Sequence, residues 1–202
     1  MKRIAIVGAS GTIGAAVARA LEERGDEVIR LSRRTSPPLD LEDGESVARC
    51  LQVLGLVNAL VCTAGRARFG RVLDASDATY ELGLFSKLMG QIRLVRLGAP
   101  HLVPGGAIVL TSGLLAHRAI PGTAPVALVN AALETFVRTA AQELDTVRLG
   151  VVSPPMVLET AVAQGRSLDG AAPARAVAET YLAVVDGSAT GATHFVDKHS
   201  PS

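Results

Sequence analysis

Three glycines near the start of the chain have the spacing of a nucleotide phosphate site. Gly8, Gly11 and Gly14 follow the apolar segment 4–7 and precede the small and apolar residues of 15–21. In such a turn the first glycine allows the bend after a strand, the second lets a pyrophosphate approach the backbone, and the third lets the helix pack on the strand. The N–H groups at the helix start can then bind the phosphates. The alternative is a tight turn without a ligand. We expect a dinucleotide site at Gly8, Ser10, Gly11, Thr12, Ile13 and Gly14.

The end of the second expected strand indicates which dinucleotide would bind. An NAD site usually has an acidic side chain there, which binds the ribose 2′-OH. This chain instead has Ser32, Arg33 and Arg34. Because guanidinium groups form bidentate contacts with phosphate, these residues favour NADP(H) over NAD(H). The alternative is that both arginines are solvated loop charges. Asp40, which follows two prolines, can accept a hydrogen bond from the adenine amino group.

The elements that would position these residues alternate between strand and helix along the chain. Repeating strand–helix units with short loops predict an α/β protein, a single-domain Rossmann fold over residues 1–202. Its doubly wound parallel sheet would have about seven strands, with helices on both faces and the ligand at the carboxyl ends of the strands. We expect residues 197–202 to form a flexible tail. The segments are strands at 3–7, 26–31, 57–62, 107–111, 147–152 and 193–196, and helices at 12–24, 43–54, 76–99, 124–144 and 173–185.

The composition narrows the class of protein. Of the 202 residues, 49% are hydrophobic and 3% aromatic, so Val, Leu, Ile and Ala must form the core, as in parallel sheets covered on both faces. The formal net charge of +1 argues against nucleic acid as a partner. No apolar run reaches the ~20 residues of a membrane span. The N-terminus has no signal-peptide pattern, and Cys50 and Cys62 lack metal-ligand spacing, so we expect a reduced, cytoplasmic protein without a metal site.

Six short segments carry a resemblance to a known family. They are 8–14, Asp40-Leu41, Cys62-Thr63-Ala64-Gly65, Thr111-Ser112-Gly113, Asn130-Ala131-Ala132-Leu133 and Ser153-Pro154-Pro155. On these segments nearly the whole chain resembles the short-chain dehydrogenase/reductase family. The resemblance implies that Ala64 and Gly65 lie against the nicotinamide-side ribose and that Ser112 polarises a substrate carbonyl. It also implies cofactor contacts for Leu41, Thr63, Asn130, Pro154 and Thr160.

The resemblance fails at the family's catalytic tyrosine and lysine, which are four residues apart. Alignment on residues 131–133 places Val126 at the tyrosine position and Asn130 at the lysine position. Val126 cannot donate a proton, and Asn130 can bind ribose hydroxyls but carries no charge. The two tyrosines of the chain, Tyr80 and Tyr181, fall in other expected helices. The expected cofactor site is therefore kept, whereas the usual proton relay is not.

Three residues are our candidates for the missing catalytic groups. Lys87, in the expected helix 76–99, can stabilise a developing alkoxide or take the place of the missing lysine at the ribose. His117, five residues after Ser112, can transfer a proton near neutral pH. Ser112 can donate a hydrogen bond but is too weak an acid to act alone. The alternatives are a solvated helix lysine and a polar loop histidine.

These features favour an NADP(H)-dependent oxidoreductase that acts on a small carbonyl or alcohol substrate with an altered acid/base set. One alternative is an NADP-binding sensor or scaffold protein without turnover. Another is a non-redox enzyme that reuses the pocket. The short segment between Thr160 and Pro173 predicts an open substrate pocket. The apolar residues of helix 124–144 favour a homo-oligomer, a dimer or tetramer.

Overall fold

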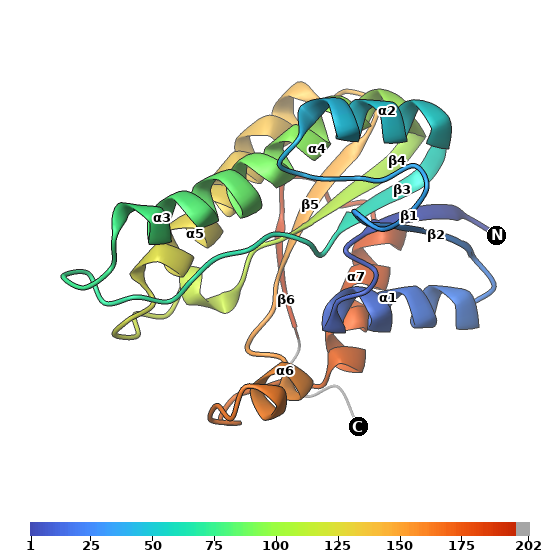
Figure 1. The fold of residues 1–202 in the computed structure, drawn as a ribbon. Helices are drawn as coiled ribbons and strands as arrows, with labels where there is room; N and C mark the ends of the chain where they lie inside the picture. Colours follow the sequence, from blue (N-terminus) through green and yellow to red (C-terminus); the bar gives the residue numbers. More distant parts are fainter. Residues whose placement is uncertain (197–202) are drawn as a thin grey trace.

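A six-stranded parallel sheet runs through the protein, and its order is β2-β1-β3-β4-β5-β6 (Figure 1). The computed structural model describes residues 1–196, and the expected tail at 197–202 lies outside them. Our prediction of about seven strands is wrong for the described residues. A further parallel strand needs a crossover of a dozen or more residues, and only one described residue follows the last strand. The strands are β1 (Arg3–Val7), β2 (Glu27–Leu31), β3 (Val57–Cys62), β4 (Leu102–Thr111), β5 (Arg148–Ser153) and β6 (Thr193–Phe195).

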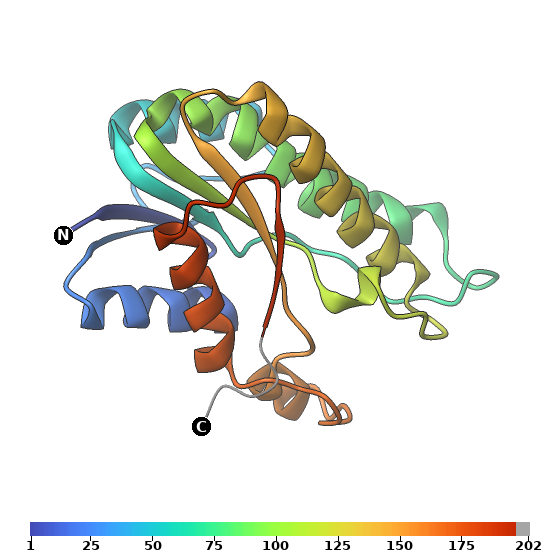
Figure 2. The same cartoon turned by 180° about the vertical axis from the view of Figure 1, so that it is seen from behind.

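Helices cover both faces of this sheet, which confirms the doubly wound α/β fold (Figures 1 and 2). The helices α1 (Thr12–Glu23) and α7 (Ala174–Asp186) pack on one face, and α2 (Gly44–Leu54), α4 (Gly90–Gly98) and α5 (Ala124–Ala140) pack on the other. Figure 1 shows the short helix α6 (Leu158–Ala163) below the sheet, on the connection from β5 to α7. The described residues also form α3 (Asp77–Gly83) and the π-helical turn η1 (Leu84–Met89). Three single-turn helices are η2 (Ala99–His101), η3 (Leu114–Ala116) and η4 (Ala141–Glu143).

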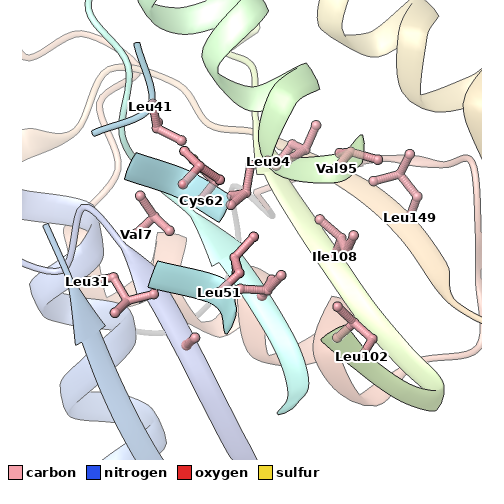
Figure 3. Packing of buried hydrophobic residues seen from close by; sticks show 14 of the residues in the cluster. Val7, Leu31, Leu41, Leu51, Cys62, Leu94, Val95, Leu102, Ile108 and Leu149 are labelled. Carbon is pink, nitrogen blue, oxygen red and sulfur yellow. The ribbon is translucent and has the colours of Figure 1, made fainter. Parts of the chain in front are cut away.

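Alternating side chains of the strands divide the core into two layers. In β1, Ile4 and Ile6 pack toward α1 and α7, whereas Ala5 and Val7 pack toward α2 and α4. Figure 3 shows part of the second layer, where aliphatic side chains of sheet and helices interdigitate around the buried Cys62. Successive strand residues point to opposite faces, so apolar runs such as 4–7 supply both layers at once.

Two predicted elements differ in detail from the structure. The expected helix 76–99 is interrupted by η1, a π-helical turn between α3 and α4. The expected strand 107–111 begins earlier, at Leu102, and its pairing with β3 shifts register between Val57 and Ala59. The proline and glycines at 104–106 therefore lie inside an irregular strand rather than in a turn before it. None of the helices within residues 1–196 is both long and apolar enough to cross a bilayer.

Candidate active site at the carboxyl ends of the strands

A cavity of about 650 Å³ opens at the carboxyl ends of β3, β4 and β5. It extends from the start of α1 to the loop before α7, as expected for a doubly wound sheet. Nine of the predicted site residues line it: Ile13, Thr63, Ala64, Gly65, Lys87, Ser112, Asn130, Pro154 and Thr160. Thus the strand ends bring together residues that are far apart in the sequence.

The glycine turn lies beside this cavity, and its three glycines differ in how closely other atoms surround them. A Cβ at Gly14 would lie 2.2 Å from the Gly8 carbonyl oxygen, and a Cβ at Gly8 would lie 2.9 Å from the Ala64 nitrogen. At Gly11 the nearest heavy atom, the Gly8 carbonyl oxygen, would be 3.5 Å away, which is an ordinary van der Waals contact. No side chain caps the N-terminus of α1, and Ser10 and Thr12 are exposed. The first N–H groups of α1 are therefore available to a phosphate, and the turn fits a bound dinucleotide.

The loop after β2 presents its two arginines to solvent. The Ser32 hydroxyl accepts a hydrogen bond from the Arg34 N–H at 3.1 Å, which tightens the turn. Neither Arg33 nor Arg34 has an ion-pair partner within residues 1–196. Both guanidinium groups are thus free to bind an anion.

The segment that follows this loop is largely engaged in its own contacts. Asp40 accepts a hydrogen bond from the Glu42 N–H at 3.0 Å and keeps its second carboxylate oxygen free of described partners. Leu41 is only 7% exposed, and its side chain packs in the core against α4. Leu41 can therefore contact a cofactor with little more than its backbone.

Lys87 enters the cavity from the π-helical turn. Its ammonium donates hydrogen bonds to the Asn130 amide oxygen at 2.6 Å and to the Ser112 carbonyl oxygen at 2.8 Å. A glycine is needed opposite it, because a Cβ at Gly65 would lie 2.9 Å from the Lys87 Cα. Burial lowers the pKa of Lys87 to about 8, although the buried groups Cys62 and Glu134 oppose that shift. The side chain is therefore a lysine whose charge can change near physiological pH.

A second network lies behind Ser112. The Ser112 hydroxyl donates a hydrogen bond to Glu134 Oε1 at 2.7 Å, and His117 Nε2 lies 2.6 Å from Glu134 Oε2. Ser112 is 3% exposed and Glu134 is 6% exposed, so this carboxyl group is held almost entirely inside the protein. His117 itself is absent from the cavity lining. It thus reaches the site only through Glu134.

Val126 and Tyr181 occupy different environments. Val126 lines the cavity with its apolar side chain. Tyr181 is fully buried and its hydroxyl bonds to the Thr111 hydroxyl at 2.6 Å, between helix α7 and the end of β4. Burial raises the pKa of Tyr181 well above its usual range. Tyr181 therefore belongs to the core, and it does not line the cavity.

Sequence reasoning missed Glu134 and Gln91. Glu134 follows Asn130 by one helical turn, so both side chains lie on the same buried face of α5. Gln91 is fully buried, and its amide group exchanges two hydrogen bonds with the backbone of Thr111, at 2.8 and 3.0 Å. A charged or amide residue within an otherwise apolar helical face was the available signal for both. Residues 1–196 contain no group of three or more His, Cys, Asp or Glu side chains arranged to hold a metal ion.

Comparisons with known proteins agree with this geometry. A family profile described as enoyl-(acyl carrier protein) reductase matches residues 38–184. The crystal structure of the protein lin1944 from Listeria innocua is 31% identical, with a TM-score of 0.91, and the match covers 98% of this chain and all of that one. A small-chain dehydrogenase in complex with NADPH is 29% identical, with a TM-score of 0.85, over 98% of this chain and 97% of that one. L-xylulose reductase of Bos taurus is 26% identical over 176 residues, or 78% of this chain and 72% of that protein.

The matched profile covers more than half of the chain, and the glycine turn, the sheet order and the cavity at the strand ends agree with it. The chain belongs to the short-chain dehydrogenase/reductase family.

Proposed function

We propose that this protein is an NADP(H)-dependent oxidoreductase that interconverts a small carbonyl compound and its alcohol. One observation carries the proposal: the Lys87 ammonium lies 2.6 Å from the Asn130 amide oxygen, in the cavity that begins at the glycine turn. The family resemblance places a catalytic lysine at position 130. Here the cation comes from the π-helical turn instead, and Asn130 accepts its hydrogen bond.

Lys87 of η1 thus supplies a cation beside Asn130 of α5, the position at which the family resemblance implies a lysine. Two acceptors, Asn130 and the Ser112 carbonyl, hold the Lys87 ammonium in one position. Such a fixed charge can stabilise a developing alkoxide or hold a ribose hydroxyl without reorganising during the reaction. The Ser112 hydroxyl, at the cavity wall, can donate a hydrogen bond to the carbonyl oxygen. When bound, the dinucleotide supplies the hydride.

The preference for NADP(H) over NAD(H) rests on Arg33 and Arg34. They follow β2, where an NAD site usually has an acidic residue, and their guanidinium groups are exposed. A 2′-phosphate can bind two guanidinium groups, whereas a 2′-hydroxyl gains little from them. The NADPH complex of the similar small-chain dehydrogenase supports this choice.

A second candidate function is the binding of NADP without turnover. Val126 favours it, because an apolar side chain lines the cavity at the position of the family's tyrosine. Under this alternative the double variant Val126→Tyr/Asn130→Lys would gain carbonyl reduction that the wild-type protein lacks.

We also propose that the protein forms a homo-oligomer through η1 and α5. Phe85 is 61% exposed, Leu128 is 49% exposed and Met89 is 37% exposed. Phe85 and Met89 are four residues apart and share one helix face, and Leu128 lies on the neighbouring α5. Such exposed apolar side chains on adjacent helices are suited to a second copy of the chain.

Cofactor binding and turnover test the proposal in sequence. The purified protein is titrated with NADPH and with NADH, and nicotinamide fluorescence and heat are followed. We expect tight NADPH binding and at least about tenfold weaker NADH binding, as for a lost charged phosphate contact. NADPH oxidation is then measured with L-xylulose, diacetyl and 4-nitrobenzaldehyde. Binding without turnover of any carbonyl would favour the second candidate, and no binding of either dinucleotide would refute both.

A further inference from the structure

We propose that Glu134 is a positioning residue that passes protons between His117 and Ser112, and that these three residues replace the missing tyrosine as the route of the proton to the substrate. This inference rests on the proposed oxidoreductase function. It assigns a role to a carboxyl group that neither the family resemblance nor the comparisons identify.

The geometry forms a continuous path from the cavity to solvent. Ser112 lines the cavity and its hydroxyl is 2.7 Å from Glu134 Oε1. Glu134 Oε2 is 2.6 Å from His117 Nε2. The side chain of Glu134 is 8% exposed, whereas that of His117 is 45% exposed. A proton can therefore reach Ser112 from outside water without crossing the substrate pocket.

The surroundings hold this path in place. The ring of Phe195, from β6, packs edge-on against His117 with a centroid distance of 5.1 Å and an interplanar angle of 73°. Glu134 lies on the buried face of α5, one turn from Asn130. Lys87, from η1, is the other charged group that faces Glu134. A carboxyl group that bonds two proton-carrying side chains through its two oxygens has the arrangement of a relay.

Each transfer in the reduction balances. A hydride, which bound NADPH would supply on becoming NADP+, adds to the carbonyl carbon, and the electron pair of the C=O π bond moves to the oxygen. For this step Glu134 first takes up one proton through His117, and the Ser112 hydroxyl turns from Glu134 Oε1 to the substrate oxygen. That oxygen takes the proton of the Ser112 hydroxyl, and Ser112 Oγ takes the proton on Glu134 Oε1. Glu134 is then a carboxylate and regains a proton at Oε2 from His117 Nε2, while water protonates His117 at Nδ1. Rotation of the carboxyl group returns the proton to Oε1, and exchange with water returns the His117 proton from Nδ1 to Nε2. Alcohol oxidation runs the same steps in reverse.

The path also supplies the proton that Ser112 needs after its hydroxyl has donated one to the substrate. A serine hydroxyl alone is a poor acid, so donation to an alkoxide leaves a charge that must be neutralised. Glu134 neutralises it over one hydrogen bond. Within the described part of the chain, the other ammonium or imidazole group at this site is Lys87, which uses two of its three N–H donors in hydrogen bonds to Ser112 and Asn130. Lys87 thus provides charge, and the Ser112–Glu134–His117 path provides the proton.

The test uses Glu134→Gln and His117→Ala, with Glu143→Gln and His101→Ala as matched controls outside the site. In Glu134→Gln the amide keeps the shape and one acceptor oxygen of the carboxyl group but cannot carry a proton, and position 117 is exposed enough to tolerate truncation. For each protein we measure NADPH affinity, KM and kcat with 4-nitrobenzaldehyde, and the solvent deuterium isotope effect on kcat. The His117→Ala variant is also assayed with added imidazole.

We expect kcat to fall by about 100-fold in Glu134→Gln, with NADPH affinity and KM nearly unchanged, because the proton step alone is lost. The solvent isotope effect should rise, and imidazole should restore much of the kcat of His117→Ala. The controls should behave as the wild type. If Glu134→Gln does not fold, the imidazole rescue of kcat in His117→Ala tests the relay by itself.

Two results would overturn the relay while leaving the oxidoreductase function intact: wild-type kcat in both variants, or a loss in His117→Ala that imidazole does not restore. A wild-type protein that reduces none of the carbonyl probes would instead refute the proposed function, and the relay with it.

Discussion

We expect the activity of this protein to be sensitive to mildly alkaline pH, because the pKa of Lys87 is lowered. Burial holds this pKa at about 8, compared with 10.5 for a free lysine. If the ammonium form is the active one, about 90% of the protein is active at pH 7 and about 10% at pH 9. An ordinary lysine would remain almost fully charged at both values. We therefore expect kcat/KM for the carbonyl to fall about tenfold between pH 7 and pH 9.

The assay is initial-rate NADPH oxidation at saturating NADPH, with the carbonyl varied, from pH 6 to pH 10. The reduced nicotinamide ring is neutral, so it adds no charge beside Lys87. The matched variant is Lys87→Arg, because arginine keeps its charge throughout this range. Whatever activity this variant retains should not fall at pH 9. A wild-type profile that is flat to pH 10, or the same fall in Lys87→Arg, would refute the role of the Lys87 charge.

The same pKa predicts how the free energy of unfolding depends on pH. The folded-state pKa is below the unfolded-state value, so the unfolded chain binds more protons between pH 8 and pH 10.5. The cost of burying the charge is fully present below pH 8 and disappears as the pH rises toward 10.5. Compared with Lys87→Met in urea unfolding, the wild type should gain at most about 3 kcal/mol across this interval. Solvent at the cavity mouth reduces this gain in the free energy of unfolding. If the wild type gains no stability relative to Lys87→Met as the pH rises, Lys87 is not a buried ammonium.

Three further changes test the cofactor site and the proposed interface. The double variant Arg33→Ala/Arg34→Ala should weaken NADPH binding by at least about tenfold while NADH binding changes little, as measured by fluorescence titration. Gly14→Ala should destabilise the protein by at least about 1–3 kcal/mol and abolish NADPH binding, because its Cβ would lie 2.2 Å from the Gly8 carbonyl oxygen; an unchanged Tm would contradict this packing. Phe85→Glu should lower the molar mass in light scattering toward that of a monomer, and a monomeric wild type would refute the interface.

The chain contains clear local signals for its fold and for half of its site. The glycine turn, the apolar runs and the helix boundaries all depend on neighbouring residues, so α1, β1 and the position of the cavity could be predicted. Tertiary contacts determined the structure where the sequence pattern did not predict it. The helix expected at 76–99 contains a π-helical turn, which carries Lys87 on its inward side. π-helical turns are found at functional sites, but the periodicity of this segment did not reveal one.

The pairings that we propose to be catalytic were harder to predict, because they join residues that are distant in sequence. Lys87 and Asn130 are 43 positions apart and meet only because η1 packs against α5. The role that we propose for Glu134 depends on a hydrogen bond to a serine 22 positions earlier. A charged residue on an apolar helical face was a signal that Glu134 is buried, but it did not indicate the partner of either contact.

By itself, the sequence determined the parallel sheet, the phosphate turn and the residue types at positions 126 and 130, because these follow from residue type and from spacing within single elements. Only the tertiary structure decided that Lys87 supplies a cation where Asn130 stands, that Tyr181 belongs to the core, and that Glu134 connects Ser112 to His117. The physical reason is that burial and hydrogen-bond partners are set by how the elements pack, and these in turn set the charge and proton chemistry of each side chain.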